Sequence, residues 1–499
     1  MLLRNSIWNL SGLALPTLVA LATVPILIRS LGMEGFGIIT LIGSVVGYFS
    51  VLDLNLSAGS IKYLAQFHAQ QEEDKFYETF WFGCLFYGLL GITGCLLLFA
   101  SAEFFVNHLF SQSTESHHDL LLALRLAAFG FLLTQMQSYF LVVPQALQRY
   151  DYSAQSECMF GVLFNVASAL IASVGGGIVG VIAVRVVISA LNLIYMLTML
   201  HHLGIALKPR CPSRHIVHLL TRFSAYAYLS RMGSLLHQYG DKLIIGLLAG
   251  PVAVTLYTVP SQLASRLLGL TYRLSSVIYP RVSALSATGE FSRLRLLYLD
   301  SSRLVTYLNL AVLGIVILCG DKFLYYWVGE QFVETGYPIL ILIACAMFLD
   351  SLTNLPSLVN DGVGHPQLTG QFAVARGIVG IALIFLGTTF FDIRGAAAAH
   401  LLASLIMSVL FLRIVHERTV PASLRETIQL ALFPSIAIGS VVFLVMIPAK
   451  YFLHPDLTGL ILLTLLSVAA FTTVGLLFVV NASERSALYA FAKHLMRYA

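Results

Sequence analysis

The feature that most constrains this chain is a succession of long apolar stretches, separated by short breaks rich in glycine, proline, asparagine and charged residues. About 20 consecutive apolar residues cross the hydrocarbon core of a bilayer as one helix. A backbone inside that core must satisfy its own hydrogen bonds, as a helix does. We therefore predict an all-α integral membrane protein with about fourteen transmembrane helices, at residues 5–28, 36–60, 77–100, 120–146, 154–174, 177–200, 220–248, 252–280, 303–320, 336–358, 367–390, 395–415, 427–448 and 457–480.

The composition excludes a soluble globular fold. Of the 499 residues, 58% are hydrophobic and 11% are charged, whereas about 25% of the residues in an ordinary soluble domain are charged. The net charge of +5 is modest, and its placement along the chain favours membrane orientation over nucleic-acid binding. We expect membrane lipids, and no nucleic acid, among its partners.

The distribution of lysine and arginine predicts the orientation. With the N-terminus placed in the cytoplasm, the alternating inside segments hold about 19 basic residues and the outside segments about 4. This asymmetry follows the positive-inside rule. We therefore predict an even number of spans, with both termini in the cytoplasm.

A weak internal repeat predicts two similar halves. Gly32 ends one apolar stretch and Phe36–Thr40 follow it, while Gly250 ends another and Val254–Thr258 follow at the same spacing. Six predicted helices separate the two copies, so the copies have the same orientation and are related by an axis along the membrane normal.

The repeat predicts two pseudo-symmetric six-helix lobes plus two extra C-terminal helices. The tail is predicted to form an amphipathic helix on the anionic inner leaflet, with a partner-binding role as the alternative. The predicted parts are an N-terminal lobe at 1–200, a cytoplasmic linker at 201–219, a C-terminal lobe at 220–425, two additional helices at 426–481 and the tail at 482–499.

The sequence contains no motif for catalysis or for a cofactor. No glycine precedes any lysine in a phosphate-binding loop, no GxSxG elbow occurs, and the six cysteines lack metal or disulfide spacing. We therefore expect a transporter without ATPase activity, without a metal and without a cofactor. Transport would draw on a proton or sodium gradient, the membrane potential or the gradient of the substrate.

Ionisable residues inside the apolar stretches are the candidate functional residues. An arginine at the centre of a membrane helix costs about 2.5–3.5 kcal/mol, so it should face a bundle interior or a wet cavity. Arginine also matches phosphate groups by its fork of donors. The arginines are Arg125, Arg185, Arg231, Arg266 and Arg376, and the acids are Asp53, Glu157, Asp241 and Asp350.

Two interpretations of these charges remain open. In the first, the arginines bind an anionic substrate, and the acids serve as proton or cation coupling sites. In the second, the charges form ion pairs between helices, for instance Arg231 with Asp241 or Arg376 with Asp350. The excess of basic residues within the spans favours the first interpretation for the group.

Helical spacing places some of these residues on polar stripes. Tyr228, Arg231 and Asp241 lie on one stripe of the stretch 220–248, and Gln262 with Arg266 lies on another in 252–280. Stripes of this kind from both lobes, facing each other, would enclose a polar cavity with net positive charge.

Five short motifs resemble one known family of membrane transporters. They are Leu27–Gly37, Leu52–Ser57, Asp241–Gly246 followed by Val254–Tyr257, Tyr279–Ser283, and Arg394–Ala399. In order and spacing they resemble the oligosaccharide flippases, the polysaccharide-transporter branch of the multidrug/oligosaccharidyl-lipid/polysaccharide exporter superfamily. The likeness covers nearly the whole chain, although Asn55 and Thr255 stand where the family commonly has glycine.

The resemblance implies a flippase of the bacterial inner membrane. Such proteins move an isoprenoid-pyrophosphate-linked oligosaccharide from the cytoplasmic to the periplasmic leaflet, for O-antigen, capsule or exopolysaccharide assembly. Alternating access around a basic central cavity would suit that substrate. The polysaccharide polymerase machinery would be a further partner.

Three other functions compete with this interpretation. An ion-coupled multidrug or organic-cation antiporter of the same superfamily would need an acidic, aromatic cavity, which the arginines disfavour. A non-transporting membrane partner of a polysaccharide synthase would use its buried charges for stability alone. A membrane glycosyltransferase would need a sizeable loop for its site, and the longest loop here has roughly 20 residues.

Overall fold

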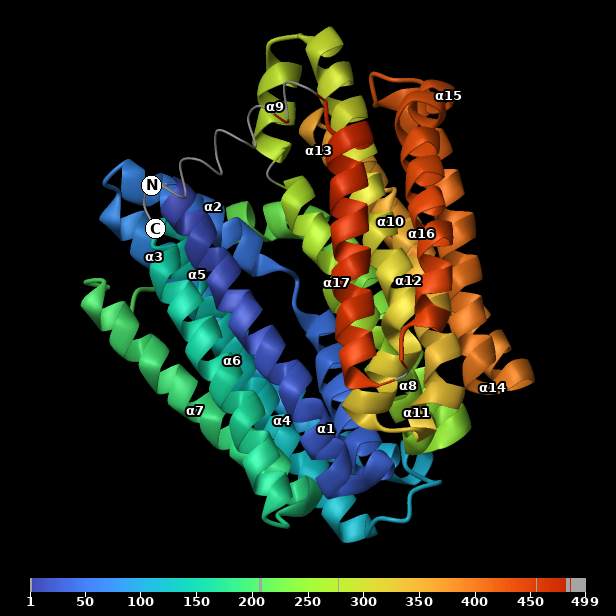
Figure 1. Cartoon of the computed structure of the whole chain (residues 1–499). Coiled ribbons are helices and arrows are strands. Elements are labelled where there is room, and N and C mark those ends of the chain that lie inside the picture. The colour runs from blue at the N-terminus through green and yellow to red at the C-terminus, as the bar shows by residue number, and fades with distance from the viewer. Residues whose placement is uncertain (1, 206–208, 277, 455, 482–484, 486–499) are drawn as a thin grey trace. The chain divides into compact units, whose positions relative to one another are not determined.

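The chain folds entirely into helices and their connections. The computed structural model describes residues 2–205, 209–276, 278–454, 456–481 and 485 (Figure 1). Helices account for 89% of it, with no strand among these residues. Within the same residues, 11 helices are long and apolar enough to cross a membrane. The predicted all-α fold is therefore confirmed.

Three of these helices contain a sharp reversal of the backbone. α1 (Leu2–Tyr48) is kinked at Gly32 (φ 73°), and α8 (Arg214–Ser276) is kinked at Gly250 (φ 81°). α14 (Pro366–Arg418) is kinked at Phe391 and Asp392, where Asp392 has φ 55°. A positive φ is easily adopted by glycine and tolerated by aspartate. All three kinks fall in breaks predicted from the sequence.

Contacts divide the chain into two compact units. Unit 1 comprises residues 1–256 and 373–389, and unit 2 comprises residues 257–372 and 390–499. The lobes, linker and added helices predicted from the repeat remain a prediction. The predicted amphipathic tail, 482–499, lies outside the described residues apart from Arg485.

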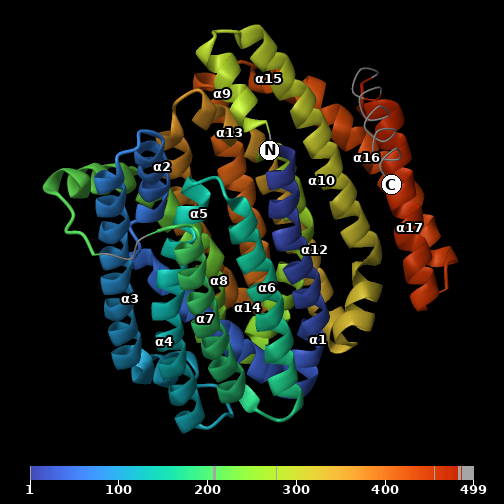
Figure 2. The ribbon, with the colours of Figure 1, turned by 90° about the vertical axis from the view of Figure 1, so that its left-hand side faces the viewer.

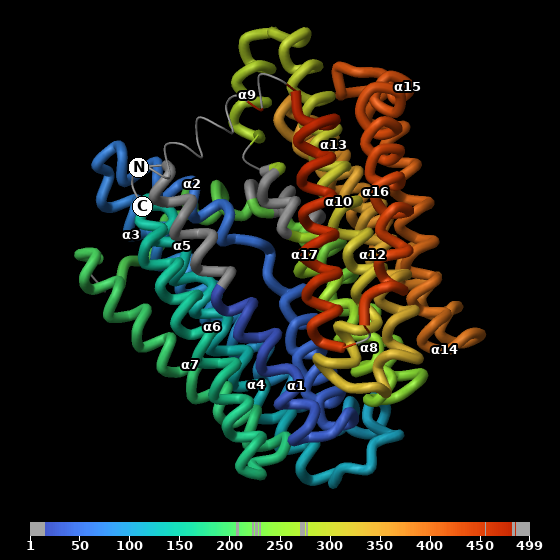
Figure 3. Tube along the Cα trace, viewed as in Figure 1, coloured from blue at the N-terminus to red at the C-terminus, as the bar shows by residue number. Residues whose placement is uncertain are grey.

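Unit 1 contains a layer of helices that run side by side. In Figures 1 and 3, α1 lies along α6 (Tyr150–Ser173), and α7 (Gly177–His202) lies against both α6 and α4 (His117–Phe140). α6 and α7 are joined by a tight turn with Gly175 at φ 82° and Gly177 at φ 61°. The break predicted at 175–177 is therefore confirmed.

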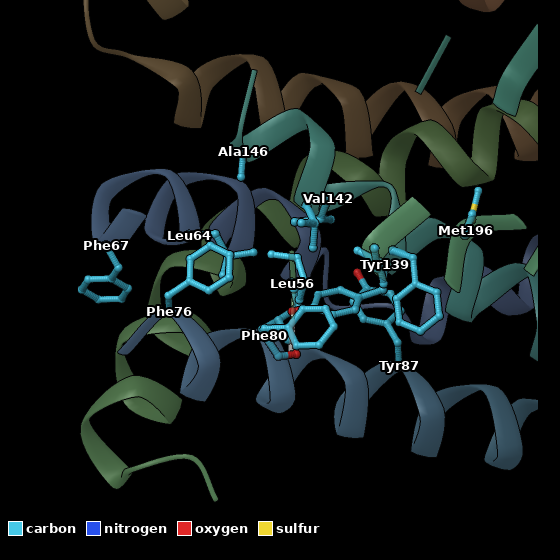
Figure 4. Packing of buried hydrophobic residues seen from close by; sticks show 14 of the residues in the cluster. Leu56, Leu64, Phe67, Phe76, Phe80, Tyr87, Tyr139, Val142, Ala146 and Met196 are labelled. Atoms are coloured by element: carbon cyan, nitrogen blue, oxygen red, sulfur yellow. Dashed lines mark hydrogen bonds between the residues drawn. The ribbon is translucent and has the colours of Figure 1, made fainter. Parts of the chain in front are cut away.

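A second group of elements in unit 1 packs around stacked tyrosines. α2 (Leu56–Ala69), α3 (Glu73–Leu109) and α5 (Val142–Ala146) join the end of α4 here (Figure 4). The rings of Tyr87 and Tyr139 stack with centroids 5.2 Å apart, and both side chains are fully buried. The Tyr139 hydroxyl donates to the Phe80 carbonyl at 2.9 Å, as a buried hydroxyl must find a partner.

The second half of α1 packs closely against α8 within unit 1. A Cβ added at Gly37 would lie 1.9 Å from the Pro251 carbonyl oxygen, so only glycine fits there. The Thr255 hydroxyl donates to the Met33 carbonyl at 2.6 Å. Thr255, one of the two departures from the resembling family, thus forms a hydrogen bond between the two helices.

Unit 2 is built around the long helix α10 (Phe291–Val328). α12 (Gly336–Ser351), α16 (Phe433–Phe452) and α17 (Leu457–Val474) pack on it, as Figure 2 shows for α16. The Tyr307 hydroxyl donates to the Phe471 carbonyl at 2.7 Å, and Lys450 pairs with Asp321 at 2.8 Å. The shorter helices of the unit are α9 (Tyr279–Ala287), α11 (Gln331–Glu334), α13 (Asn354–Gly362) and α15 (Leu424–Thr427).

Candidate functional site

The second predicted membrane helix is interrupted near its middle. Helix α1 ends at Tyr48 and is followed by a 3-10 turn, η1 (Phe49–Leu52), and then by α2 from Leu56. Asn55 has φ 56°, a left-handed conformation. The expectation of one uninterrupted helix over 36–60 was therefore wrong. In a membrane protein, non-helical backbone is tolerated only where protein groups or a wet cavity satisfy it.

Asp53 satisfies the interrupted backbone and is itself buried, with 2% of its surface exposed. Its Oδ1 accepts hydrogen bonds from the backbone amide of Asn55 at 2.9 Å and from the Tyr87 hydroxyl at 2.8 Å. Its Oδ2 lies 3.1 Å from the guanidinium of Arg231 in α8. Both carboxylate oxygens therefore have partners, as a buried charge requires.

Arg231 stays partly exposed although it pairs with Asp53. Its side chain is 35% exposed in the structure, whereas that of Asp53 is 3% exposed. One stripe neighbour, Tyr228, donates its hydroxyl to the Val51 carbonyl at 2.7 Å. The two residues therefore share a face of α8, as their spacing predicts, and that face contacts the interrupted helix.

The ion-pair interpretation gave Arg231 with Asp241 as an example. The structure does not contain this pair, because Arg231 pairs with Asp53. Asp241 instead lies 3.1 Å from Lys242, whose ammonium also donates to the Gln238 carbonyl at 2.6 Å. An ion pair was one of the two possibilities for Arg231. Its partner is Asp53, at the interruption between α1 and α2, and spacing along α8 could not indicate a partner from another helix.

Arg376 comes close to the same region of unit 1. A Cβ added at Gly233 would lie 2.4 Å from the backbone carbon of Ala373, so α8 and the 373–389 segment of α14 cross with their backbones in contact. The crossing is two residues from Arg231 and three from Arg376. The segment that carries Arg376 is thus held against the segment that carries Arg231.

Two other predicted arginines are engaged with aromatic rings in unit 1. The Arg185 guanidinium lies 4.7 Å from the centroid of Phe164 and donates to the Ser168 hydroxyl at 3.0 Å. The Arg125 guanidinium lies 4.8 Å from the centroid of Phe99. Cation–π contacts of this kind stabilise a guanidinium away from bulk water. The structure therefore gives both side chains a packing role.

Three predicted residues remain to be described, namely Glu157, Arg266 and Asp350. Glu157 is exposed on α6 and lines a cavity of unit 1. Arg266 and Asp350 are half-buried in unit 2, so a common cavity that holds all the predicted arginines and acids stays a prediction, as does the pairing of Arg376 with Asp350.

Sequence reasoning missed several residues that the structure makes important. Tyr87 was counted only as an apolar residue, although its hydroxyl binds Asp53. Asn165 and Asn192 line the cavity with Glu157. Amide side chains inside apolar stretches were the signal for them, because a polar group there must have a partner.

The family follows from a sequence profile that covers more than half of the chain. The profile is described as "Polysaccharide biosynthesis protein" and matches residues 2–286. The chain belongs to this family. The predicted membership of the polysaccharide-transporter branch is thereby confirmed.

Two related proteins are similar to this family member over most of their own length. A protein of Shigella flexneri, provisionally named O-antigen transporter, is 26% identical over 84% of this chain and 98% of its own. A protein of Escherichia coli with the same provisional name is 24% identical over 80% of this chain and 93% of its own. The family and these relatives indicate a transporter and not an enzyme.

Solved structures show which fold the family member has. The lipid II flippase MurJ, in an inward closed conformation, matches with a TM-score of 0.73 at 12% identity, over 95% of this chain and 98% of that chain. An inward-facing multidrug resistance MATE family transporter of the MOP superfamily matches with a TM-score of 0.67 at 15% identity, over 82% and 97%. At these identities, the matches show the fold alone.

Proposed function

We propose that this protein is a flippase for an isoprenoid-pyrophosphate-linked oligosaccharide in a bacterial inner membrane. It moves the substrate from the cytoplasmic to the periplasmic leaflet for O-antigen, capsule or exopolysaccharide synthesis. Support comes from the family, from relatives provisionally named as O-antigen transporters and from the fold shared with a lipid II flippase. The polysaccharide polymerase machinery would receive the product.

The proposed topology has fourteen crossings with both termini in the cytoplasm. Among the residues that the structure describes, eleven helices are long and apolar enough to span, and three of these contain the reversals at Gly32, Gly250 and Asp392. Each kinked span has 38, 39 or 53 residues, about twice the 20 or so that a bilayer needs. Counting each as two crossings gives 11 + 3 = 14, the number predicted from the sequence.

The observation that carries the proposal is the Asp53–Arg231 pair. An ionisable pair placed where a membrane helix is interrupted is the arrangement that transporters use for substrates and ions. The buried carboxylate orients the guanidinium, and the partly exposed side chain of Arg231 remains available to an anion. Arg376, on the segment that crosses beside it, would be the second cation for a pyrophosphate.

Two roles for these residues follow from the proposal. Arg231 and Arg376 bind the pyrophosphate, and Arg185 and Arg125 act through packing. Arg266 remains a separate candidate for anion binding in unit 2. The acids Asp53, Asp241, Asp350 and Glu157 are the candidates for coupling to a proton or sodium gradient. Alternating access would then follow from movement of two lobes around the basic site.

Reconstitution in proteoliposomes tests the proposed function. Purified full-length protein would be mixed with an isoprenoid-pyrophosphate oligosaccharide, and the fraction reaching the opposite leaflet would be followed with and without a proton or sodium gradient. We expect protein-dependent movement that Arg231→Ala and Arg376→Ala each lower at least about tenfold, which corresponds to about 1.4 kcal/mol. Arg413→Ala is the matched control, because Arg413 is an exposed residue paired only with Glu417 of its own helix.

A second set of variants separates substrate binding from mere stabilisation. If Arg231 serves only to neutralise Asp53, the double variant Asp53→Asn/Arg231→Gln should transport as well as the wild type, since it removes both charges together. If Arg231 binds the substrate, the double variant should fold but not transport, whereas Asp53→Asn alone, which keeps Arg231, should still transport. Loss of transport in Asp53→Asn alone would assign the effect to Asp53. Uptake of organic cations without movement of any lipid-linked glycan would overturn the flippase and favour a drug antiporter.

A further inference from the structure

Unit 1 contains a cavity of about 380 Å³ between α4, α6 and α7, and more of its surface is apolar than polar. Its size falls in the range of small-molecule sites, about 300–1,000 Å³. Glu157 is the one charged residue among the described residues that line it. Half of the lining consists of neutral polar side chains, namely Thr134, Gln137, Ser138, Ser156, Asn165, Ser189 and Asn192.

A chain of hydrogen bonds fixes one wall of this cavity. The Ser156 hydroxyl donates to Asn192 Oδ1 at 2.9 Å, and Asn192 Nδ2 donates to Gln137 Oε1 at 3.4 Å. Gln137 Nε2 in turn donates to the Ser189 carbonyl. The chain joins α6, α7 and α4, so it holds the amides of this wall in one orientation before any ligand arrives.

Three other lining residues, Asn165, Thr134 and Ser138, present hydrogen-bond acceptors. Asn165 Nδ2 donates to the Gly161 carbonyl of its own helix at 2.8 Å, which leaves its Oδ1 as an acceptor. The hydroxyls of Thr134 and Ser138 also donate to carbonyls of their own helix, at 2.8 and 2.9 Å, and keep their lone pairs. A ligand that fits this surface must therefore offer several hydrogen-bond donors.

The charge of the lining narrows the ligand further. No lysine or arginine belongs to the described lining, and the carboxylate of Glu157 would repel a phosphate. Arg185 is not part of this lining, and its guanidinium contacts Phe164 and Ser168.

We infer that this cavity is a subsite for a neutral sugar unit rich in hydroxyl groups. The sugar hydroxyls donate to Asn165, Ser138 and Thr134, and the apolar face of the ring packs against Phe160 and Phe164, which also line the cavity. The inference rests on the proposed function and extends it: the glycan and the pyrophosphate are recognised by separate groups of residues.

Saturation-transfer NMR on the full-length protein in detergent micelles tests the subsite. Glucose and N-acetylglucosamine are the neutral probes, and tetraethylammonium is the cation probe. We expect both sugars to give a signal that Asn165→Leu lowers about five- to tenfold and Ser138→Ala about two- to threefold, as the loss of one hydrogen bond predicts.

Gln155→Leu is the matched control for Asn165→Leu. Both positions are amides on α6, but Gln155 lies on its exposed side and does not line the cavity. Its sugar signal should equal that of the wild type. If Asn165→Leu does not give a single folded species by gel filtration, the sugar signal of Ser138→Ala decides whether the subsite exists. This variant removes only one exposed hydroxyl, so we expect it to fold.

Several results would overturn the subsite. The first is that neither sugar gives a signal. The second is that the sugar signals are equal in Asn165→Leu, Ser138→Ala and the wild type. The third is a tetraethylammonium signal that Glu157→Gln abolishes, while the sugars give no signal. Failure of the proposed function looks different: wild-type protein would bind the sugars normally but move no lipid-linked glycan in proteoliposomes. Flipping by the wild type with no sugar signal would reject the subsite alone.

Discussion

The carboxylate of Asp53 lies 3.1 Å from the guanidinium of Arg231. One helical turn before Arg231, the Tyr228 hydroxyl donates to the carbonyl of Val51, which is 177 residues away in the sequence. The pair joins the interrupted helix near the start of the chain to α8 within unit 1. It also shows how one buried acid serves three donors, namely the Arg231 guanidinium, the Tyr87 hydroxyl and the Asn55 amide.

Removing one partner of this pair should cost stability. Arg231→Gln leaves the carboxylate of Asp53 buried without its countercharge, and we expect a loss of about 1–3 kcal/mol. Asp53→Asn/Arg231→Gln should recover part of that loss, because no buried charge remains. Thermal unfolding in detergent, measured for both single variants and the double variant, gives the coupling. Purely additive losses would contradict the pairing.

The Tyr87 hydroxyl should contribute through Asp53. It donates to the carboxylate at 2.8 Å and accepts from the Ser57 amide at 3.1 Å. Tyr87→Phe keeps the stacked ring and removes both bonds, so we expect a loss of about 1–3 kcal/mol. The comparison is Tyr325→Phe, at a tyrosine that is 48% exposed, with both transitions followed by differential scanning fluorimetry. Equal melting temperatures would show that the hydroxyl contributes nothing.

A methyl group at Gly37 should not fit between α1 and α8. Its Cβ would lie 1.9 Å from the Pro251 carbonyl oxygen, and a backbone atom cannot rotate away. We expect Gly37→Ala to cost about 1–3 kcal/mol, as overpacking does. The control is Gly43→Ala in the same helix, where no atom lies within 4 Å of the added Cβ. If the two variants unfold at the same temperature, α1 and α8 do not pack as described.

Acid should weaken the start of α17 through Asp456. The Gly459 amide and the Thr458 hydroxyl bind its carboxylate and lower its pKa from 3.8. Because the folded-state pKa is depressed, the stabilisation is present above pH 3.8 and is lost as the pH falls through the folded value. Asp456→Asn should therefore melt with a weaker dependence on pH between 5 and 3 than the wild type, by scanning fluorimetry. An unchanged dependence would contradict the cap.

Much of the fold was predictable because the bilayer imposes it. The breaks at Gly32, Gly250 and 175–177 were visible as glycines between apolar stretches, and the structure places left-handed backbone at all three. The interruption at 53–55 was not visible, since Leu52, Leu54 and Leu56 continue the apolar pattern. The break is held by Asp53, whose partners Tyr87 and Arg231 lie far along the chain, and such distant contacts leave no local signal.

The candidate site was predictable in kind but not in detail. Buried arginines were expected, and helical spacing correctly placed Tyr228 and Arg231 on one face. The partner of Arg231, the aromatic contacts of Arg185 and the position of Arg376 beside Gly233 depend on which helices cross. Crossing points are set by glycines and aromatic rings packing in three dimensions, which spacing along one helix does not encode.

The three reversals within α1, α8 and α14 have a consequence for engineering the protein. Each turns the chain at one or two residues, with no linker on either side. Epitope tags or fluorescent reporters inserted at Gly32, Gly250 or Asp392 would have to break helical backbone, whereas connections such as Ser111–Ser116 already lie outside any helix. Insertion tolerance should therefore map onto these connections and exclude the three reversals.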